Sequence, residues 1–275
     1  MPLDKEFILD NVGEYTEEAV TWIREELSDK GKLYVAFSGG KDSIVTAKLI
    51  EMAGVDHQLY YNDTTIEPPA VMKFIRKEYP QCIWLRPKHS FFKQIPKLNP
   101  PLRGAKWCCF HIKKIPGWKI KLDQRVLGIR WEESSFRKQL GRSQLVNIGT
   151  FRSYYKREQN HMHYHPIYYW PTWAIWEFIE EQKLPFPHLY DTFDRLGCVV
   201  CPMRKRANME KWRKIYPSYY RAFEKACAIW YDRRTAQGRT MAYSCVEAFL
   251  EAWYSHKVSW YDKEFRDLKE EKEKE

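Results

Sequence analysis

The fold of this chain is decided by one stretch, Leu33-Tyr-Val-Ala-Phe-Ser-Gly-Gly-Lys-Asp-Ser43. Its first five residues are apolar, several of them large or β-branched, and they predict one buried strand. Ser38-Gly39-Gly40 ends that strand, and residues 43–53 follow with a helical pattern that Gly54 is placed to end. A glycine turn between a strand and a helix is an anion site, because free N–H groups and the helix dipole face the ligand there.

The side chains of this turn suit a phosphate ligand. Gly39 and Gly40 let the backbone approach closely, and Lys41 adds a positive charge. Ser38 and Ser43 offer hydroxyl groups. The spacing differs from the Gly-x4-Gly-Lys-Ser/Thr loop of P-loop NTPases. A tight turn between a core strand and a core helix is the plain structural alternative, but the complete Ser-Gly-Gly-Lys-Asp-Ser string favours a nucleotide site.

This string resembles the PP-loop of the ATP pyrophosphatases, also called the adenine nucleotide α-hydrolase family. In that family the loop holds the pyrophosphate end of ATP while a substrate oxygen attacks the α-phosphate. The resemblance implies binding of ATP with Mg²⁺. It also implies that Lys41 stabilises the leaving group and that Asp42 shapes the loop or is linked to Mg²⁺, rather than acting as a general base. The nucleotide-binding residues expected here are Ser38, Gly39, Gly40, Lys41, Asp42, Ser43, Asp63 and Gly128.

The remaining pattern predicts an α/β fold with a doubly wound parallel sheet, because strands alternate with helices. Ligands of such sheets bind beyond the carboxyl ends of the strands, which places Ser38 and Asp63 along one rim. Strands are expected at 33–37, 58–61, 82–86 and 125–130. Helices are expected at 16–28, 43–53, 70–78, 173–183 with Thr172 as its cap, 208–234, 243–253 and, as a solvated or frayed end, 262–275.

Charge and composition restrict the class of protein. The formal net charge is +10, and residues 101–160 hold 14 Lys and Arg against 4 Asp and Glu. This concentration indicates a polyanionic partner, with a generally basic enzyme as the alternative. No apolar run has membrane-spanning length, and the charged start lacks the pattern of a signal peptide. We therefore expect a soluble, cytoplasmic protein with no membrane partner.

Residues 139–165 are polar and irregular and include the motif His161-x-His163-x-His165. Alternate residues of a strand share one face, so the three imidazoles form a possible metal site. An exposed polar strand or hairpin is the favoured interpretation. The segment also has the character of a mobile substrate loop.

Seven cysteines in a chain of this type favour metal or redox chemistry over disulfides. Cys198-x-x-Cys201 suits a redox pair, half a zinc site or part of an iron–sulfur site. The tandem Cys108-Cys109 adds two more thiols, and adjacent cysteines are awkward in a tetrahedral zinc site. Spacing alone leaves zinc and a [4Fe–4S] cluster open. Cys82 in a strand and Cys245 in an apolar helix are expected to be structural.

Several motifs in order carry a second resemblance. Cys-Cys-x-x-x-Lys-Lys-x-Pro begins at 108, Gly-Ile-Arg-x-x-Glu-Ser-x-x-Arg begins at 128, and Leu-Tyr-Asp and Gly-Cys-x-x-Cys-Pro follow. From about residue 32 to 203 the set is similar to the phosphoadenosine phosphosulfate reductase superfamily. The resemblance implies that Arg130 and Arg137 contact the phosphate or sulfate end of a ligand, with catalytic roles alongside Lys41 and Asp42. It also implies a [4Fe–4S] cluster held by Cys108, Cys109, Cys198 and Cys201.

Two departures from sulfonucleotide reductases matter. Their catalytic Glu-Cys-Gly-Leu-His motif is absent, with only Ser244-Cys245-Val246 in the C-terminal region, and the PP-loop is intact although reductases tend to alter it. Both departures favour the sulfur-transfer branch, most like the iron–sulfur proteins of DNA phosphorothioation systems. This resemblance implies nucleic acid, DNA first, as substrate. It further implies a cysteine desulfurase or other sulfur donor and further modification-system subunits as partners.

Three other functions stay open: an adenylyl-sulfate or phosphoadenylyl-sulfate reductase, a tRNA thiolation enzyme, and a non-catalytic metal module that binds nucleic acid. The expected organisation is an N-terminal helical segment at 1–30, a PP-loop nucleotide-binding domain at 31–170, and a cysteine-rich, mostly helical region at 171–275. This last region would complete the iron–sulfur site.

Overall fold

The computed structural model describes residues 8–147 and 160–258, and within them the chain divides into two compact units. The first unit comprises Met1–Tyr61, Pro69–Leu85 and Ile120–Leu196, and the second comprises Asn62–Pro68, Arg86–Lys119 and Gly197–Glu275. The units alternate along the sequence, so their borders differ from the consecutive segments 1–30, 31–170 and 171–275 expected above. The helix expected at 262–275 lies outside the described residues.

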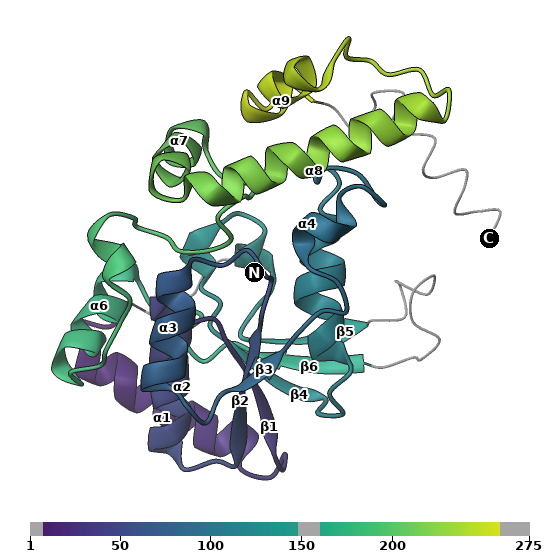
Figure 1. Cartoon of the computed structure of the whole chain (residues 1–275). Coiled ribbons are helices and arrows are strands. Elements are labelled where there is room, and N and C mark those ends of the chain that lie inside the picture. The colour runs from purple at the N-terminus through teal and green to yellow at the C-terminus, as the bar shows by residue number, and fades with distance from the viewer. Residues whose placement is uncertain (1–7, 148–159, 259–275) are drawn as a thin grey trace. The chain divides into compact units, whose positions relative to one another are not determined.

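A six-stranded, mostly parallel sheet forms the centre of the first unit, in the order β3-β2-β1-β4-β6-β5 (Figure 1). β1 pairs in parallel with β2 and with β4, and β4 pairs in parallel with β6. Only β5 runs antiparallel, against β6, among the pairings described. The strands are β1 (Leu33–Phe37), β2 (His57–Asn62), β3 (Ile83–Leu85), β4 (Gln124–Leu127), β5 (Ser143–Asn147) and β6 (Asn160–Tyr164).

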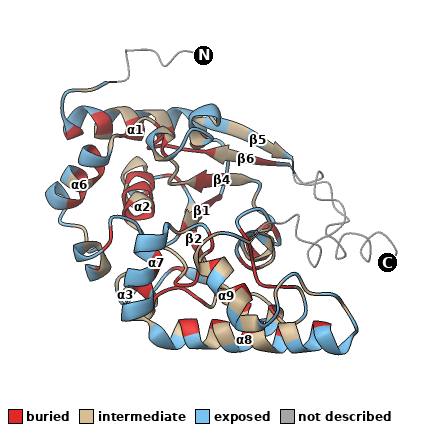
Figure 2. Cartoon of the chain, turned by 90° about the horizontal axis from the view of Figure 1, so that it is seen from above, coloured by how far each residue is buried: buried red, intermediate tan, exposed pale blue. Residues whose placement is uncertain are grey.

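Helices cover this sheet with their apolar faces. The helix α1 (Val12–Leu27) begins at Asn11, whose side chain accepts a hydrogen bond from the Glu14 N–H at 3.0 Å. α2 (Lys41–Ala53) ends at Gly54 in the left-handed conformation, as predicted. α2 is largely buried (Figure 2), because it packs on β1, β4, α1 and α6. The other helices of this unit are α3 (Pro69–Glu78) and α6 (Thr172–Glu181), with short 3₁₀ turns η3 (Trp131–Glu133), η4 (Arg137–Gln139) and η6 (His188–Asp191).

The structure corrects three local predictions in the first unit. β4 ends at Leu127 rather than at residue 130, because the chain turns at Gly128 into η3. The histidine motif forms β6 and the residue after it, and β6 pairs antiparallel with β5, in agreement with the expected strand or hairpin. His161 and His165 are fully buried, so the expected exposure of these side chains was wrong. The cap of α6 is Pro171 and not Thr172, whose hydroxyl bonds Glu132 instead.

The second unit is helical. Residues expected to form one helix at 208–234 form two, because Pro217 lacks the N–H that a continuous helix needs. Eight large aromatic side chains are buried in the described part of this unit: Phe91, Trp118, Trp212, Tyr220, Phe223, Trp230, Phe249 and Trp253. Its helices are α4 (Phe91–Gln94), a π-helical turn η2 (Cys109–Lys114), α5 (Ile115–Trp118), α7 (Arg206–Ile215), α8 (Pro217–Ala236) and α9 (Val246–Tyr254).

Within the described ranges, no helix combines the length and apolar character that crossing a membrane requires.

Candidate functional site

The predicted anion loop joins β1 to α2 in the first unit. Gly39 has a φ of 68°, and an added Cβ there would lie 2.9 Å from the side chain of Ile75, so glycine is required on both counts. The Ser43 hydroxyl donates to the Gly40 carbonyl at 2.8 Å and accepts from the Ser38 N–H at 3.2 Å. Ser43 therefore holds the loop in shape from inside rather than offering its hydroxyl outward.

Asp42 is the centre of an ion-pair network at the start of α2. Its carboxylate lies 2.8 Å from Lys41 Nζ and 2.6 Å from Arg130 Nε. Burial raises the pKa of Asp42, but the charges of Lys41 and Arg130 more than offset it, and the pKa lies below its ordinary value. Burial lowers the pKa of Lys41 against the pull of Asp42, so the pair favours the charge of Asp42 more than that of Lys41.

Arg130 is fixed by further partners. Its NH1 group donates to Glu132 at 2.8 Å, to the Trp170 carbonyl at 3.2 Å and to the Thr172 hydroxyl at 3.2 Å. The side chain is only 4% exposed. A guanidinium held in this way keeps one orientation, with its Nε and NH1 groups engaged by the protein and its positive charge fixed beside the loop. Both carboxylate oxygens of Asp42 are engaged by cations, so Asp42 holds Lys41 and Arg130 together at the start of α2.

Two arginines share one carboxylate beside this network. Arg137, predicted as an anion contact, forms an ion pair with Glu133, and Arg195 lies 3.6 Å from the same residue. Burial and the neighbouring Arg195 charge lower the pKa of Arg137. Arg195 was not among the predicted site residues, because it stands outside the motifs.

Tyr190 is a second residue that the predicted site lacked. Its hydroxyl accepts a hydrogen bond from the backbone N–H of Lys41 at 2.8 Å. A sequence signal existed, since Tyr190 is the central residue of the Leu-Tyr-Asp motif.

Two residues that were predicted to bind the nucleotide, Gly128 and Asp63, have different surroundings. Gly128 lies against the first turn of α2, where a Cβ would come within 2.8 Å of the Asp42 carbonyl oxygen. Asp63 follows directly after β2 but belongs to the second unit. There its carboxylate accepts from the Thr65 N–H at 2.8 Å and lies 3.7 Å from Arg86. Gly128 thus shapes the loop site, and a nucleotide contact by Asp63 stays a prediction.

The four cysteines predicted as cluster ligands all lie in the second unit. Cys109 begins η2, a π-helical turn of a kind that is rare and often found at functional sites. The Cys198 Sγ lies 3.5 Å from the Glu67 carboxylate and 3.6 Å from the Thr64 hydroxyl. The charges of Cys109, Cys198 and Cys201 contribute to raising the pKa of Cys108.

The pKa values of these four cysteines are shifted in different directions. The hydrogen bond with Cys109, burial and the neighbouring thiols raise the pKa of Cys108. The hydrogen bond from Cys108 and the charges of nearby lysines, Lys113 first, lower the pKa of Cys109 to about 6. Burial raises the pKa of Cys198 and of Cys201. Cys109 is therefore the thiol that forms a thiolate most readily.

This donor set suits a [4Fe–4S] cluster, whose ligands are four thiolates. Across residues 8–147 and 160–258, no three His, Cys, Asp or Glu side chains converge as a single metal ion would need. The fit to a cluster accordingly rests on the chemistry of the four thiols, which the described structure does not bring together as a ready metal site.

The other cysteines and the histidine motif have different environments. Cys82 is buried in the first unit and burial raises its pKa to about 12, which confirms a structural role. Cys245, expected inside an apolar helix, is exposed at the N-terminal end of α9. His161 is buried with neither ring nitrogen hydrogen-bonded, and Asp123 lies 3.8 Å away.

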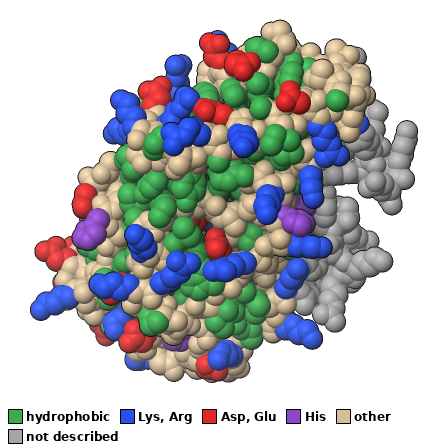
Figure 3. All heavy atoms as spheres, in the orientation of Figure 1, with side chains coloured by type: hydrophobic (Ala, Val, Ile, Leu, Met, Phe, Trp, Pro, Cys, Tyr) green, Lys and Arg blue, Asp and Glu red, His purple; other side chains and the backbone are tan. Residues whose placement is uncertain are grey.

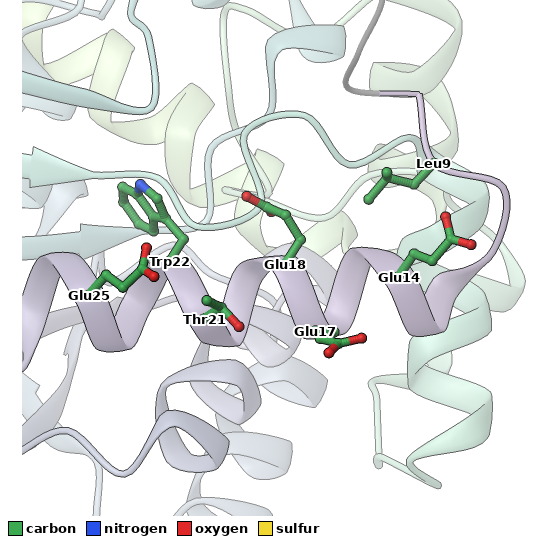
Figure 4. A pocket seen from close by; sticks show the side chains of 7 residues that line it. All are labelled: Leu9, Glu14, Glu17, Glu18, Thr21, Trp22 and Glu25. Carbon is green, nitrogen blue, oxygen red and sulfur yellow. The ribbon is translucent and has the colours of Figure 1, made fainter.

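A groove along α1 has the wrong charge for a phosphate (Figure 4). Its lining residues are Leu9, Glu14, Glu17, Glu18, Thr21, Trp22 and Glu25. Basic side chains are instead spread over the face displayed in Figure 3, rather than gathered in one patch.

Comparison with known proteins identifies the family of the chain. Within the chain, residues 32–204 match the phosphoadenosine phosphosulfate reductase domain. An uncharacterized protein of Methanocaldococcus jannaschii is 27% identical over 235 residues, which are 80% of this chain and 46% of that protein. An adenosine 5'-phosphosulfate reductase of Staphylococcus haemolyticus is 24% identical over 67% of this chain and 75% of its own length.

The chain spans about half the length of the first curated relatives it matches. Among solved structures, the phosphoadenylyl-sulfate reductase of Candida auris in a phosphate complex has a similar fold, with a TM-score of 0.50 and 16% identity. That similarity covers 72% of this chain and 97% of the other. Because the family match extends over well more than half of the sequence, the chain belongs to the phosphoadenosine phosphosulfate reductase domain family.

Proposed function

We propose that this chain is an ATP pyrophosphatase that adenylates a backbone oxygen of nucleic acid for sulfur insertion, as in DNA phosphorothioation. The observation that carries the proposal is the intact anion loop. Lys41 stands at the start of α2, beside the Asp42–Arg130 ion pair that orients a buried guanidinium. A loop built in this way suits the cleavage of a triphosphate, because cations next to the pyrophosphate stabilise the charge that develops on it.

The reaction would proceed in two displacements. A phosphate oxygen of the nucleic acid attacks the α-phosphorus of ATP, the bond to the β-phosphate oxygen breaks, and pyrophosphate leaves with Mg²⁺. A sulfur nucleophile then attacks the adenylated phosphorus, and AMP departs with the original oxygen. In the first step Lys41, Arg130 and the loop N–H groups bind the pyrophosphate, while Asp42 holds the two cations in place.

The second unit would supply the sulfur chemistry. Cys108, Cys109, Cys198 and Cys201 would hold a [4Fe–4S] cluster, which supplies a site for sulfur when it is bound. If all four thiols are ligands, sulfur must come from a partner such as a cysteine desulfurase. Further modification subunits belong to the same proposal. Lysines near Cys109, among them Lys106, Lys113 and Lys114, favour a polyanionic substrate whose binding weakens as salt rises.

An adenylyl-sulfate reductase is the second candidate, because Cys245 is exposed and a reductase is among the relatives. Such an enzyme needs a nucleophilic thiol that attacks the sulfur of the sulfonucleotide, releasing AMP and then sulfite once a thiol reductant has acted. The Cys245→Ser variant separates the candidates. It should abolish sulfite release by a reductase that relies on this thiol, and it should leave pyrophosphate release from ATP unchanged.

The experiment that tests the proposal measures pyrophosphate and AMP release by anaerobically purified protein. ATP is offered alone, with DNA or with RNA, and adenylyl sulfate with a thiol reductant forms a separate arm. We expect release that DNA stimulates, a loss of at least about a hundredfold in Lys41→Ala, and little change in Lys48→Ala, a lysine of the same helix paired with Glu51. Stimulation by RNA alone would indicate thiolation of RNA. Sulfite release without ATP cleavage would overturn the proposal in favour of the reductase.

A further inference from the structure

The N-terminal end of α2 already has a hydrogen-bond acceptor. The first N–H groups of a helix have no partner within the helix, and they are the groups an anion would contact. Here the N–H of Lys41, the first residue of α2, donates to the Tyr190 hydroxyl at 2.8 Å. A Cβ added to Gly40 would lie 3.1 Å from that hydroxyl, so the oxygen stands directly against the loop.

Tyr190 comes from a part of the chain distant in sequence but within the same unit. It lies in η6, where its own N–H donates to the Pro187 carbonyl at 3.1 Å. Its ring makes an edge contact with Trp176, with 5.1 Å between centroids, and it lies 6.4 Å from Phe186. Phe186 is 37% exposed, so this aromatic group lies at the protein surface.

We infer that Tyr190 is a ligand-displaced residue of the nucleotide site, whose hydroxyl leaves the Lys41 N–H when a pyrophosphate oxygen binds there. This inference rests on the proposed function. It adds that Tyr190 controls how tightly the loop between β1 and α2 binds an anion. A hydrogen bond to a charged phosphate oxygen is roughly twice as strong as one between neutral groups. Replacement of the Tyr190 hydroxyl by a pyrophosphate oxygen at the Lys41 N–H is therefore favourable. The short turn η6 and the surface aromatic contacts are the parts that must shift.

The displacement has a measurable consequence. While the hydroxyl holds the Lys41 N–H, the apparent affinity for an anion equals the intrinsic affinity multiplied by the fraction of molecules in which the hydroxyl has left. Tyr190→Phe keeps the ring and its contact with Trp176 but removes the competing acceptor. We expect this variant to bind inorganic pyrophosphate roughly three- to tenfold more tightly than the unaltered protein, since a single neutral hydrogen bond is lost from the competing state.

The test is calorimetric titration of the full chain with inorganic pyrophosphate. The matched control is Tyr164→Phe, which removes another tyrosine hydrogen bond of the first unit, the one to Gln124 at 2.7 Å, and should leave the affinity unchanged. Unchanged or weaker binding by Tyr190→Phe would overturn the inference, because the hydroxyl would then be neutral or helpful to the ligand. Thermal unfolding of each variant shows that it is folded.

A second measurement follows the movement itself. Pyrophosphate should change the fluorescence of the unaltered protein, and Trp176→Phe should remove that change, because Trp176 contacts the ring that moves. A change that persists in Trp176→Phe would contradict a displacement at Tyr190. If neither the unaltered protein nor Tyr190→Phe binds pyrophosphate, the anion site and the proposed function fail together. If both bind with equal affinity, only the inference fails.

Discussion

The anion loop of the first unit and the four thiols of the second differ in how far the protein compensates their charges. At the loop, Asp42 lies between Lys41 and Arg130, and its charge is compensated within the fold. At the thiols, the hydrogen bond with Cys109 and burial raise the pKa of Cys108, and burial raises the pKa of Cys198 and of Cys201. Among these four thiols, only Cys109 has a lowered pKa. The hydrogen bond from Cys108 and the positive charges of nearby lysines lower it.

The difference indicates how each site is completed. The loop network forms on folding, since its positive and negative partners come from the chain itself. Four thiolates need a cationic group to hold them together, because metal ligands must be deprotonated and the protein compensates little of that charge. The charges of the first site are therefore balanced within the fold, whereas the charges of four thiolates would need a bound cationic group.

The largest expected effect concerns the four thiols of the second unit. Cys198→Ser should lose nearly all bound iron and the visible absorbance of the cluster, in protein purified without oxygen. Changes to outer partners alone cost about 10–100-fold in metal affinity, and loss of a ligand should cost at least as much. Cys245→Ser, which alters an exposed cysteine of the same unit, should keep both iron and colour. Equal iron content in the two variants would contradict the assignment of Cys198.

Next in size is the removal of Arg130. Arg130→Ala should lower the free energy of unfolding by about 3–5 kcal/mol at neutral pH, because it leaves the carboxylate of Asp42, 20% exposed, without its buried partner. Urea denaturation measures the loss. Arg206→Ala removes an exposed ion pair with Glu210 and should change stability by less than about 1 kcal/mol.

The same variant has a defined pH dependence. The pKa of Asp42 is lower in the folded chain than its ordinary value of 3.8, so its ion pairs add stability above that value. This contribution is lost as pH falls through the lowered pKa. The stability difference between the unaltered protein and Arg130→Ala should therefore be full at neutral pH and shrink in acid. A difference that stays constant down to the acid limit of folding would show that Asp42 is not the partner that matters.

A smaller effect is expected from the contact that shapes the loop. Gly128→Ala should cost roughly 1–3 kcal/mol and weaken pyrophosphate binding, because its Cβ would press on the backbone of Asp42. The control is Gly54→Ala at the other end of α2. That variant strains a residue with φ of 74° but meets no atom within 4 Å, so it should lower stability and leave binding intact. If Gly128→Ala bound pyrophosphate with unaltered affinity, Gly128 would have no part in shaping the anion site.

The anion loop could be predicted because its determinants are contiguous in sequence. The Ser38–Ser43 string carries its own strand end, glycine turn and helix start. The strand ends at Phe37 as expected, and α2 begins at Lys41, two residues before the expected start at Ser43. The contact of Lys41 with Tyr190 joins residues 149 positions apart, which no local pattern reveals. The burial of β6 was missed because its polar histidines lack an apolar pattern, although the strand lies between β4 and β5 and His161 is fully buried. Cys245 was misplaced by a few residues at a helix boundary, which exposes it.

The smallest effect concerns the rim of the loop site. Arg195 is 71% exposed and 3.6 Å from Glu133, so Arg195→Ala should change the free energy of unfolding by less than about 0.5 kcal/mol. Its charge nevertheless lies near Lys41 and Tyr190 and should attract an anion. We expect pyrophosphate affinity to fall about two- to fivefold at low salt, and this loss to disappear near 1 M salt, where the screening length is about 3 Å. A loss that persists at high salt would instead mean that Arg195 makes a direct, buried contact with the ligand, and that the anion site extends further than Arg130.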